Sequence, residues 1–182
     1  MRADAKKNYD RLLAVAKEAV TVSGADLSLR DVARRAEVGL GTLYRHFPTR
    51  EALLEALLRS SFEELVERAN TLTASMASDQ ALLLWLEEII TFTYSHRGVL
   101  GLMMGAIEDQ ESALHVSCVT LRAAGAALLS RAQSENKARP DIDGTDLFAL
   151  IAALAWVREQ PSAAPRADHL FKVITSALLT TP

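Results

Sequence analysis

Hydrophobic residues recur with the period of an α-helix along almost the whole chain. Between residues 8 and 22 they lie three and four positions apart, which places them on one face of a helix. Gly24 is positioned to end this helix, because glycine readily adopts the left-handed conformation common just after a helix. Two short helical patterns follow at 28–36 and 41–47, separated by a turn at 37–40.

The ends of these patterns carry residues that start and stop helices. Ser28 is expected to cap the helix that follows it, with Asp31 completing a capping box. Pro48 ends the next helix, since the residue before a proline avoids the helical conformation. Thr49 is expected to cap a long amphipathic helix whose apolar stripe reaches about Thr73.

The remaining residues predict five more helices after a small, polar junction at 74–78. Asp79 is expected to cap the first of them. The five patterns cover about 79–96, 99–107, 110–135, 145–160 and 166–180. The predicted fold class is therefore all-α, with about nine helices. A three-helix head at 1–48 precedes a helical body at 49–182, and the helix at 49–73 links the two.

The composition agrees with a helical protein that has a sizeable core. Of the residues, 49% are hydrophobic and 5% aromatic, with only five prolines and eight glycines. The single cysteine, Cys118, excludes an intramolecular disulfide and is typical of a reducing compartment. The charged N-terminus lacks the apolar run of a signal peptide, and no later apolar stretch reaches the ~20 residues of a membrane span. A cytoplasmic protein without membrane contact is expected.

Charge is distributed unevenly along the chain. Up to residue 50 there are ten Lys or Arg and six Asp or Glu, whereas the remainder has ten and seventeen. A basic head on an acidic body is typical of a protein that meets phosphate groups at one end. Chance variation in surface charge is the alternative, so this pattern alone favours nucleic acid only slightly.

The helices at 28–36 and 41–47 have the spacing of a helix-turn-helix, a motif whose second helix lies in the major groove of DNA. That helix should carry hydrogen-bond donors and small residues on its exposed side, and basic residues should flank it. The candidate DNA contacts are Ser28, Arg30, Gly41, Thr42, Tyr44, Arg45, His46 and Arg50. Tyr44 could instead be a packing aromatic. Solvated surface is the alternative for the paired basic residues Arg34 and Arg35, and for the basic arm Lys6 and Lys7.

Residues 41–53, GTLYRHFPTREAL, closely resemble the DNA-binding segment of TetR-family transcriptional regulators, and residues 32–38 resemble its preceding helix. Glu37 stands where the family commonly has glycine, and Gly39 where it commonly has serine. These departures could alter the backbone of the turn and remove one polar contact. The resemblance covers about residues 8–58. Residues 143–150 are similar to the C-terminal domain of the SbtR-like subgroup.

The resemblance implies a regulator that binds double-stranded DNA as a homodimer, on a palindromic operator. It implies that Thr42, Tyr44 and Arg50 contact the DNA backbone and that Leu40 faces the bases. By analogy with the family, the protein is expected to be a repressor that a small-molecule effector releases from DNA.

The helices near 145–160 and 166–180 are expected to form the homodimer interface. The apolar residues assigned to it are Leu147, Leu150, Ile151, Leu154, Leu170, Phe171, Ile174 and Leu178. The alternative is that these stripes face the chain's own core. The interface is favoured because both helices carry a second apolar or small-residue face, made of Ala152, Ala155, Trp156, Val173 and Ala177.

An effector pocket in the body would be mostly apolar, since few charges are expected inside it. Its candidate lining residues, each of a kind that is more often plain core, are Trp85, Phe92, Met103, Met104, His115, Cys118, Arg122 and Trp156. Glu111, His115 and Cys118 lie at helical spacing, but no fourth metal ligand is evident. Neither a metal nor another cofactor is expected.

An enzyme is not expected either. The chain has no His-Glu-x-x-His zinc motif, no Glu-x-x-His pair of a di-iron bundle and no Walker-type phosphate loop. The remaining alternative is a helical protein-interaction bundle that does not bind DNA. Such a bundle would predict an acidic or neutral head, whereas this head is basic.

Overall fold

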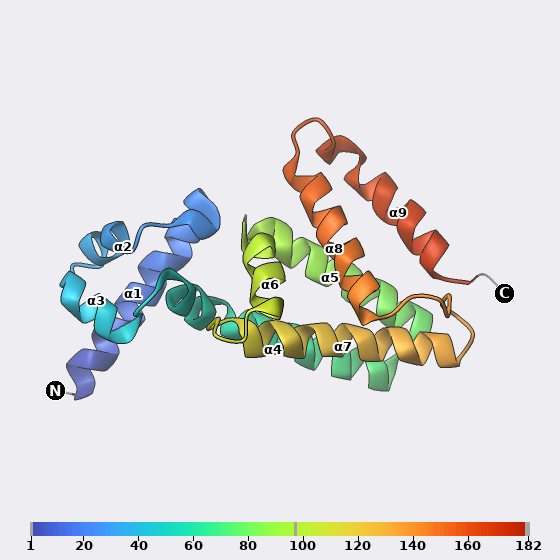
Figure 1. The fold of residues 1–182 in the computed structure, drawn as a ribbon, viewed down its shortest axis with the longest axis horizontal. Helices are drawn as coiled ribbons and strands as arrows, with labels where there is room; N and C mark the ends of the chain where they lie inside the picture. Colours follow the sequence, from blue (N-terminus) through green and yellow to red (C-terminus); the bar gives the residue numbers. More distant parts are fainter. Residues whose placement is uncertain (1, 97, 181–182) are drawn as a thin grey trace. The chain divides into compact units, whose positions relative to one another are not determined.

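A computed structural model of the chain describes residues 2–96 and 98–180 (Figure 1). Nine α-helices and two short 3-10 helices make up most of these residues, and the described part contains no β-strand. The prediction of an all-α fold with about nine helices is confirmed. The elements are α1 (Arg2–Ser23), η1 (Gly24–Asp26), α2 (Leu29–Arg35), α3 (Leu40–His46), α4 (Arg50–Ser75), α5 (Ser78–Ser95), α6 (Val99–Glu108), α7 (His115–Ser134), α8 (Gly144–Glu159), η2 (Ala164–Arg166) and α9 (Ala167–Leu178).

The helices form two compact units. The first contains Met1–Ser61 and Ser95–Cys118, and the second contains Phe62–Tyr94 and Val119–Pro182. Helices α4 and α7 therefore contribute to both. None of the helices in the described ranges combines the length and the hydrophobicity that a membrane span requires.

Side-chain acceptors set several helix ends, as the sequence predicted for two of them. The Ser28 hydroxyl accepts a hydrogen bond from the Asp31 N–H at 3.4 Å, and the Thr49 hydroxyl accepts one from the Ala52 N–H at 3.1 Å. The expected capping box at α2 is only half formed, because the Asp31 carboxylate accepts a hydrogen bond from Arg34 at 2.6 Å instead.

Other helix boundaries differ from the predicted ones. Helix α1 begins at Arg2 rather than near residue 8, so the basic pair Lys6 and Lys7 is helical and not an irregular arm. Helix α7 begins at His115 rather than near residue 110. The Asp109 carboxylate accepts a hydrogen bond from a backbone N–H two residues on, at 3.0 Å, and so stabilises a turn there.

The turn between α2 and α3 places Glu37 in the left-handed region, with φ of 53°. The Glu37 N–H donates to the Arg34 carbonyl at 3.2 Å, and the Val38 N–H donates to the Ala33 carbonyl at 3.0 Å. These two bonds form a Schellman motif, in which glycine is the usual left-handed residue. The glutamate carboxylate also accepts a hydrogen bond from Arg11 of α1 at 2.9 Å. The motif forms without glycine, at a cost in backbone strain.

Replacing Glu37 by glycine is therefore expected to raise the free energy of unfolding by roughly 0.5–1 kcal/mol. Relief of left-handed strain contributes about 1–2 kcal/mol, and the greater freedom of glycine in the unfolded chain offsets roughly half of it. The exposed ion pair with Arg11 adds little. Urea denaturation measures the change, and Glu37→Ala is the control, since alanine removes the ion pair but keeps the strain. Equal stability of Glu37→Gly and Glu37→Ala would show that the left-handed conformation of residue 37 is not strained.

The core of the second unit is centred on Trp85, which is fully buried. Its indole N–H donates to the Leu65 carbonyl of α4 at 2.9 Å. Gly125 of α7 has no side chain, and its backbone lies so close to the ring that an added Cβ would be 2.7 Å from two ring carbons. At the start of α8, a Cβ on Gly144 would similarly lie 2.5 Å from the Cβ of Ala126. Small residues thus let α5, α7 and α8 approach closely.

Charged groups join the start of α5 to the C-terminal end of α7. The Lys137 ammonium lies 3.1 Å from Asp79 and 3.3 Å from Glu135. The Ser78 hydroxyl donates to Glu135 at 2.6 Å, and Arg131 donates to the Met76 carbonyl at 3.0 Å. The carboxylate of Asp79 is therefore engaged by Lys137, and α5 begins one residue earlier than its predicted cap.

This cluster is expected to make stability depend on pH at the acid end. The hydrogen bond from Lys137 lowers the pKa of Asp79, and the hydrogen bonds from Ser78 and Lys137 lower the pKa of Glu135. A carboxyl group whose pKa is lower in the folded state stabilises the fold above its unfolded pKa. That contribution is lost as the pH falls through the folded pKa. The free energy of unfolding should start to decline below about pH 4–5. Lys137→Met should make the decline shallower in denaturation curves measured at successive pH values, and an identical pH profile would contradict this role.

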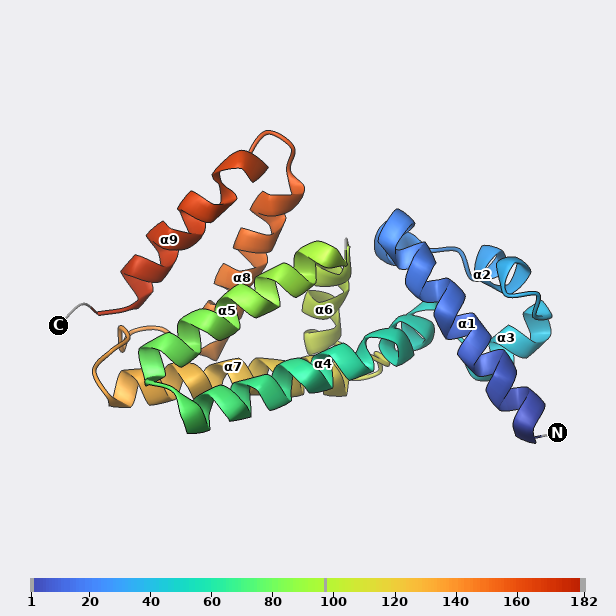
Figure 2. The same cartoon turned by 180° about the vertical axis from the view of Figure 1, so that it is seen from behind.

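Helices α8 and α9 lie side by side as an antiparallel hairpin (Figures 1 and 2). Four of the residues predicted to form the dimer interface are buried within the chain itself: Leu147, Ile151, Leu154 and Leu178. Together with Leu86 and Ile90 of α5 they form an apolar contact layer inside the chain. These four residues therefore face the core, and their assignment to the dimer interface was wrong. The other four, Leu150, Leu170, Phe171 and Ile174, are half-buried.

The hairpin keeps a second face exposed. The side chains of Trp156 on α8 and Val173 on α9 are exposed to 58% and 50%. Small exposed residues continue this face at Ala149, Ala153 and Ala177. Of the residues expected on the second faces, Trp156, Val173 and Ala177 are exposed, whereas Ala155 is buried and Ala152 is half-buried. Only the packing against α5 decided which residues are internal.

Candidate nucleic-acid interface

Helices α2 and α3 are held in place by the apolar residues on their inner faces. Val32 and Ala33 of α2, Leu43 of α3 and Phe47 just beyond it are all buried. Both helices contact α1, whose Leu12 and Ala16 are also buried. This packing leaves the opposite side of α3 facing outward, as a helix that enters a DNA groove requires.

The outward side of α3 carries most of the predicted contacts. Gly41, Tyr44 and Arg45 are exposed, and Leu40 and Thr42 are half-buried. Tyr44 is 48% exposed, which favours an outward-facing residue over a packing aromatic. A Cβ placed on Gly41 would meet nothing within 4 Å, so this position leaves a smooth surface on α3.

His46 is placed differently from the other candidates on α3. Its ring centre lies 5.8 Å from that of Tyr9 in an edge-to-face arrangement, and 6.2 Å from that of Phe47. The imidazole is half-buried in this aromatic group. Tyr9 thus positions the end of α3. Its place on the apolar face of α1 was the only sequence signal for this role.

Ion pairs neutralise several of the basic residues in the head. Arg34 pairs with Asp31 at 2.6 Å, and Arg35 pairs with Glu18 at 2.9 Å. These contacts favour the solvated-surface alternative for the two arginines. By contrast, the Arg30 side chain forms no hydrogen bond or ion pair among the described residues, and it lies exposed in the first turn of α2. Ser28, which precedes it, is exposed and caps α2.

Arg45 and Arg50 lie between the paired arginines and the unpaired Arg30, because each forms contacts that DNA could replace. The Arg45 Nε donates to the Gly41 carbonyl at 3.2 Å, which leaves its charge unneutralised. The Arg50 guanidinium lies 3.1 Å from the Asp26 carboxylate and 3.5 Å from that of Glu51. Asp26 was not recognised in the sequence as a partner, because η1 brings it beside the start of α4 only in the folded head. A phosphate at Arg50 would compete with this carboxylate.

Comparison with known families accounts for both parts of the chain. Residues 12–57 match the family described as bacterial regulatory proteins, tetR family. Residues 77–179, more than half of the 182 residues, match the family described as transcriptional regulator SbtR-like, C-terminal domain. The chain belongs to the TetR family. Its members are DNA-binding regulators and not enzymes.

This TetR-family protein is similar to solved regulators over nearly its whole length. TetR transcriptional regulator SCO0520 from Streptomyces coelicolor is 31% identical, with 96% of this chain and 99% of that one covered and a TM-score of 0.65. The TetR transcription regulatory protein from Mycobacterium vanbaalenii is 28% identical, with 98% and 99% covered and a TM-score of 0.55.

A curated relative matches over a shorter range. The HTH-type transcriptional regulator SAR2658 of Staphylococcus aureus (strain MRSA252) is 24% identical over 102 residues. The match covers 55% of this chain and 55% of that regulator, so it spans about half the length of each.

The residues predicted to line an effector pocket in this TetR-family protein are divided between the two units. Met103, Met104, His115 and Cys118 belong to the first, and Trp85, Phe92, Arg122 and Trp156 belong to the second. Trp156 and Met104 are exposed, which places them on the surface rather than inside a cavity. Phe92 packs edge-to-face on Phe62 with the ring centres 5.5 Å apart, and Trp85 fills the core of its unit.

The possible metal ligands are engaged in other contacts or buried. The His115 Nδ1 lies 2.9 Å from the Ala106 carbonyl. Cys118 is buried, and burial raises the pKa of its thiol to about 12, so it is not a thiolate at neutral pH. Within the described ranges no three His, Cys, Asp or Glu side chains are grouped as metal binding would require.

Proposed function

We propose that the protein is a homodimeric repressor that binds a palindromic operator in the cytoplasm and is released from it by a small-molecule effector. Membership of the TetR family supports the DNA-binding role. Repression follows most simply from occupancy, since a dimer on a promoter blocks access to it.

The distribution of neutralised and unneutralised charge in the head is the observation that carries this proposal. Acidic neighbours pair with Arg34 and Arg35, whereas Arg30 and Arg45 have no acidic partner in the described part. Arg45 directly follows the exposed Tyr44 on α3, one turn after Gly41, and Arg30 lies in the first turn of α2. A cation without an internal partner binds phosphate more readily, because no ion pair has to break before the cation neutralises the phosphate and releases counterions.

Arg50→Ala is expected to weaken operator binding to about the same extent on every DNA sequence, since a phosphate contact carries no sequence information. The slope of log affinity against log salt concentration should fall by about 0.9 for each protomer. Asp26→Asn removes the competing carboxylate and should strengthen binding. Anisotropy titrations on the promoter beside the protein's own gene measure both effects.

Arg34→Ala is the matched control, because the family resemblance assigns Arg34 no DNA contact and Arg34 pairs with Asp31 of its own helix. It should leave both the affinity and the salt slope unchanged. Equal losses from Arg50→Ala and Arg34→Ala would show a general electrostatic effect and remove Arg50 from the interface.

The exposed face of the α8–α9 hairpin supports the proposed dimer. Trp156 and Val173 offer large apolar groups, and the alanines that continue this face allow a close approach of helices. A single helix-turn-helix makes too few contacts for tight, specific binding, whereas a two-fold dimer reads two half-sites. Helix α4 carries residues of both units, and we propose that it transmits effector binding to the head.

A further inference from the structure

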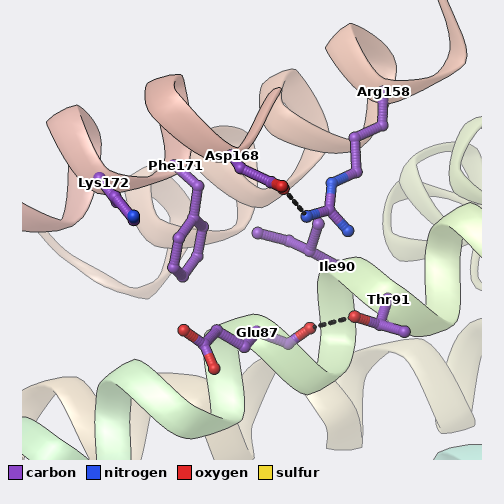
Figure 3. A pocket seen from close by; sticks show the side chains of 7 residues that line it. All are labelled: Glu87, Ile90, Thr91, Arg158, Asp168, Phe171 and Lys172. Atoms are coloured by element: carbon purple, nitrogen blue, oxygen red, sulfur yellow. Dashed lines mark hydrogen bonds and ion pairs between the residues drawn. The ribbon is translucent and has the colours of Figure 1, made fainter. Parts of the chain in front are cut away.

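A groove of about 320 Å³ lies between α5 and the α8–α9 hairpin (Figure 3). Its size is at the lower end of the range for small-molecule sites. It is lined by Glu87, Ile90, Thr91, Arg158, Asp168, Phe171 and Lys172. All seven belong to the second unit, and none is among the residues that the sequence suggested for an effector pocket.

The floor of the groove is apolar and closed. Ile90 and Phe171 line both the groove and the apolar contact layer beneath it. That layer has only about 10 Å³ of open space, which is the room of about one water molecule. A ligand in the groove would therefore rest its apolar part on Ile90 and Phe171 without entering the core.

One end of the groove is closed by an ion pair. The Arg158 guanidinium donates to the Asp168 carboxylate at 2.6 Å, and Figure 3 shows the two side chains meeting above Ile90. Because these two charges pair with each other, they are weaker partners for a ligand charge than an unpaired group would be.

The charges of Glu87 and Lys172 remain open to a ligand. Glu87 belongs to α5 and Lys172 to α9, so they approach the groove from opposite walls (Figure 3). No hydrogen bond or ion pair of either charged group occurs among the described residues. The groove thus presents an unneutralised carboxylate and an unneutralised ammonium, with the apolar side chains of Ile90 and Phe171 between the two walls.

We propose that this groove binds a zwitterion whose ammonium and carboxylate are separated by an apolar segment, as in a short apolar peptide. The ligand's ammonium pairs with Glu87, its carboxylate pairs with Lys172, and its apolar side chains lie on Phe171 and Ile90. Glu87 and Lys172 are both exposed, so a ligand with a single charge would form only one of the two ion pairs that a zwitterion forms. The identification of this ligand class as the effector rests on the proposed function, whereas the binding itself does not.

The test uses the dipeptide Leu-Phe and isothermal calorimetry on the full chain without DNA. Binding is expected at millimolar peptide or below. Glu87→Gln and Lys172→Met should each weaken it about tenfold, which corresponds to about 1.4 kcal/mol for one charged contact. N-acetylation removes the peptide's ammonium and should weaken its binding to the wild type. It should not weaken binding to Glu87→Gln any further, because that variant already lacks the carboxylate that pairs with the ammonium. The C-terminal amide should behave in the same way towards Lys172→Met.

Swapping the two charges tests whether the single changes act through the proposed ion pairs or only by disturbing the local structure. The double variant Glu87→Lys with Lys172→Glu should regain affinity, because a zwitterion can bind in the reverse direction. Glu64→Gln, an exposed change on α4 outside the groove, should leave binding unchanged. Absence of binding at millimolar peptide, or binding that neither single change weakens, overturns the proposal. Failure of DNA binding in a mobility-shift assay would instead overturn the proposed function and leave this result intact.

Discussion

Gly125→Ala is expected to lower the free energy of unfolding by about 1–3 kcal/mol, as overpacking of a filled core does. The added methyl carbon would lie 2.7 Å from Cη2 and Cζ3 of Trp85. The ring cannot retreat easily, because it is fully buried and its N–H is held by the Leu65 carbonyl at 2.9 Å. Either α7 moves away from α5 or the indole leaves its hydrogen bond. Thermal or urea unfolding measures the loss.

Gly101→Ala supplies the matched control for this change. Gly101 is an exposed residue of α6, and a Cβ there would meet nothing within 4 Å. Alanine should raise the free energy of unfolding by roughly 0.5–1 kcal/mol, since glycine is the poorer helix former. Adding Trp85→Phe to Gly125→Ala should give a combined loss smaller than the sum of the two single losses. Additive losses, or a stabilising Gly125→Ala, would show that the contact with Trp85 does not limit this packing.

Trp156→Glu is expected to give a monomer and to weaken operator binding by at least about a hundredfold. The indole is 58% exposed on the outer face of α8, so the change should leave the chain's own fold intact. If that face is buried in a dimer, each protomer would place an unpaired carboxylate in an apolar contact, which costs several kcal/mol. Loss of the dimer removes one of the two half-site contacts from the DNA complex. Sedimentation velocity and a mobility-shift assay measure the two effects.

Val116→Glu is the control for an exposed apolar residue elsewhere. Its side chain is 73% exposed near the start of α7, outside the α8–α9 hairpin. This variant should remain a dimer and bind the operator normally. A dimeric Trp156→Glu protein with normal affinity would place the interface on another surface.

The two units differ in how far their functional residues were predictable. In the head, the residues that specify the helix-turn-helix are consecutive, and their spacing alone places Tyr44 and Arg45 on the outward side of α3. In the body, ligand-binding residues come from helices far apart in the chain. Glu87 and Lys172 meet at one groove although no local pattern connects them.

Ion pairs in the head were also not predictable from the sequence when the two partners lie on different helices. Sequence spacing identified Arg34, Arg35 and Arg50 as basic residues near the motif, but not which of them was already neutralised. For Arg35 and Arg50 the answer depends on Glu18 and Asp26, whose positions relative to α2 and α4 are set by the packing of α1 and η1. An arginine's availability for phosphate is thus a tertiary property.

The sequence by itself determined the all-α fold, the helix-turn-helix and the family, because helical periodicity, capping residues and turn residues act over a few neighbouring positions. It even marked Glu37 as an unusual residue in the turn, and the left-handed φ of 53° there gives the physical reason. Only the tertiary structure decided that Leu147, Ile151, Leu154 and Leu178 face the core and that Trp156 and Val173 face outward. Helix α8 carries apolar residues on more than one face, so which face is buried depends on the position of α5 against it.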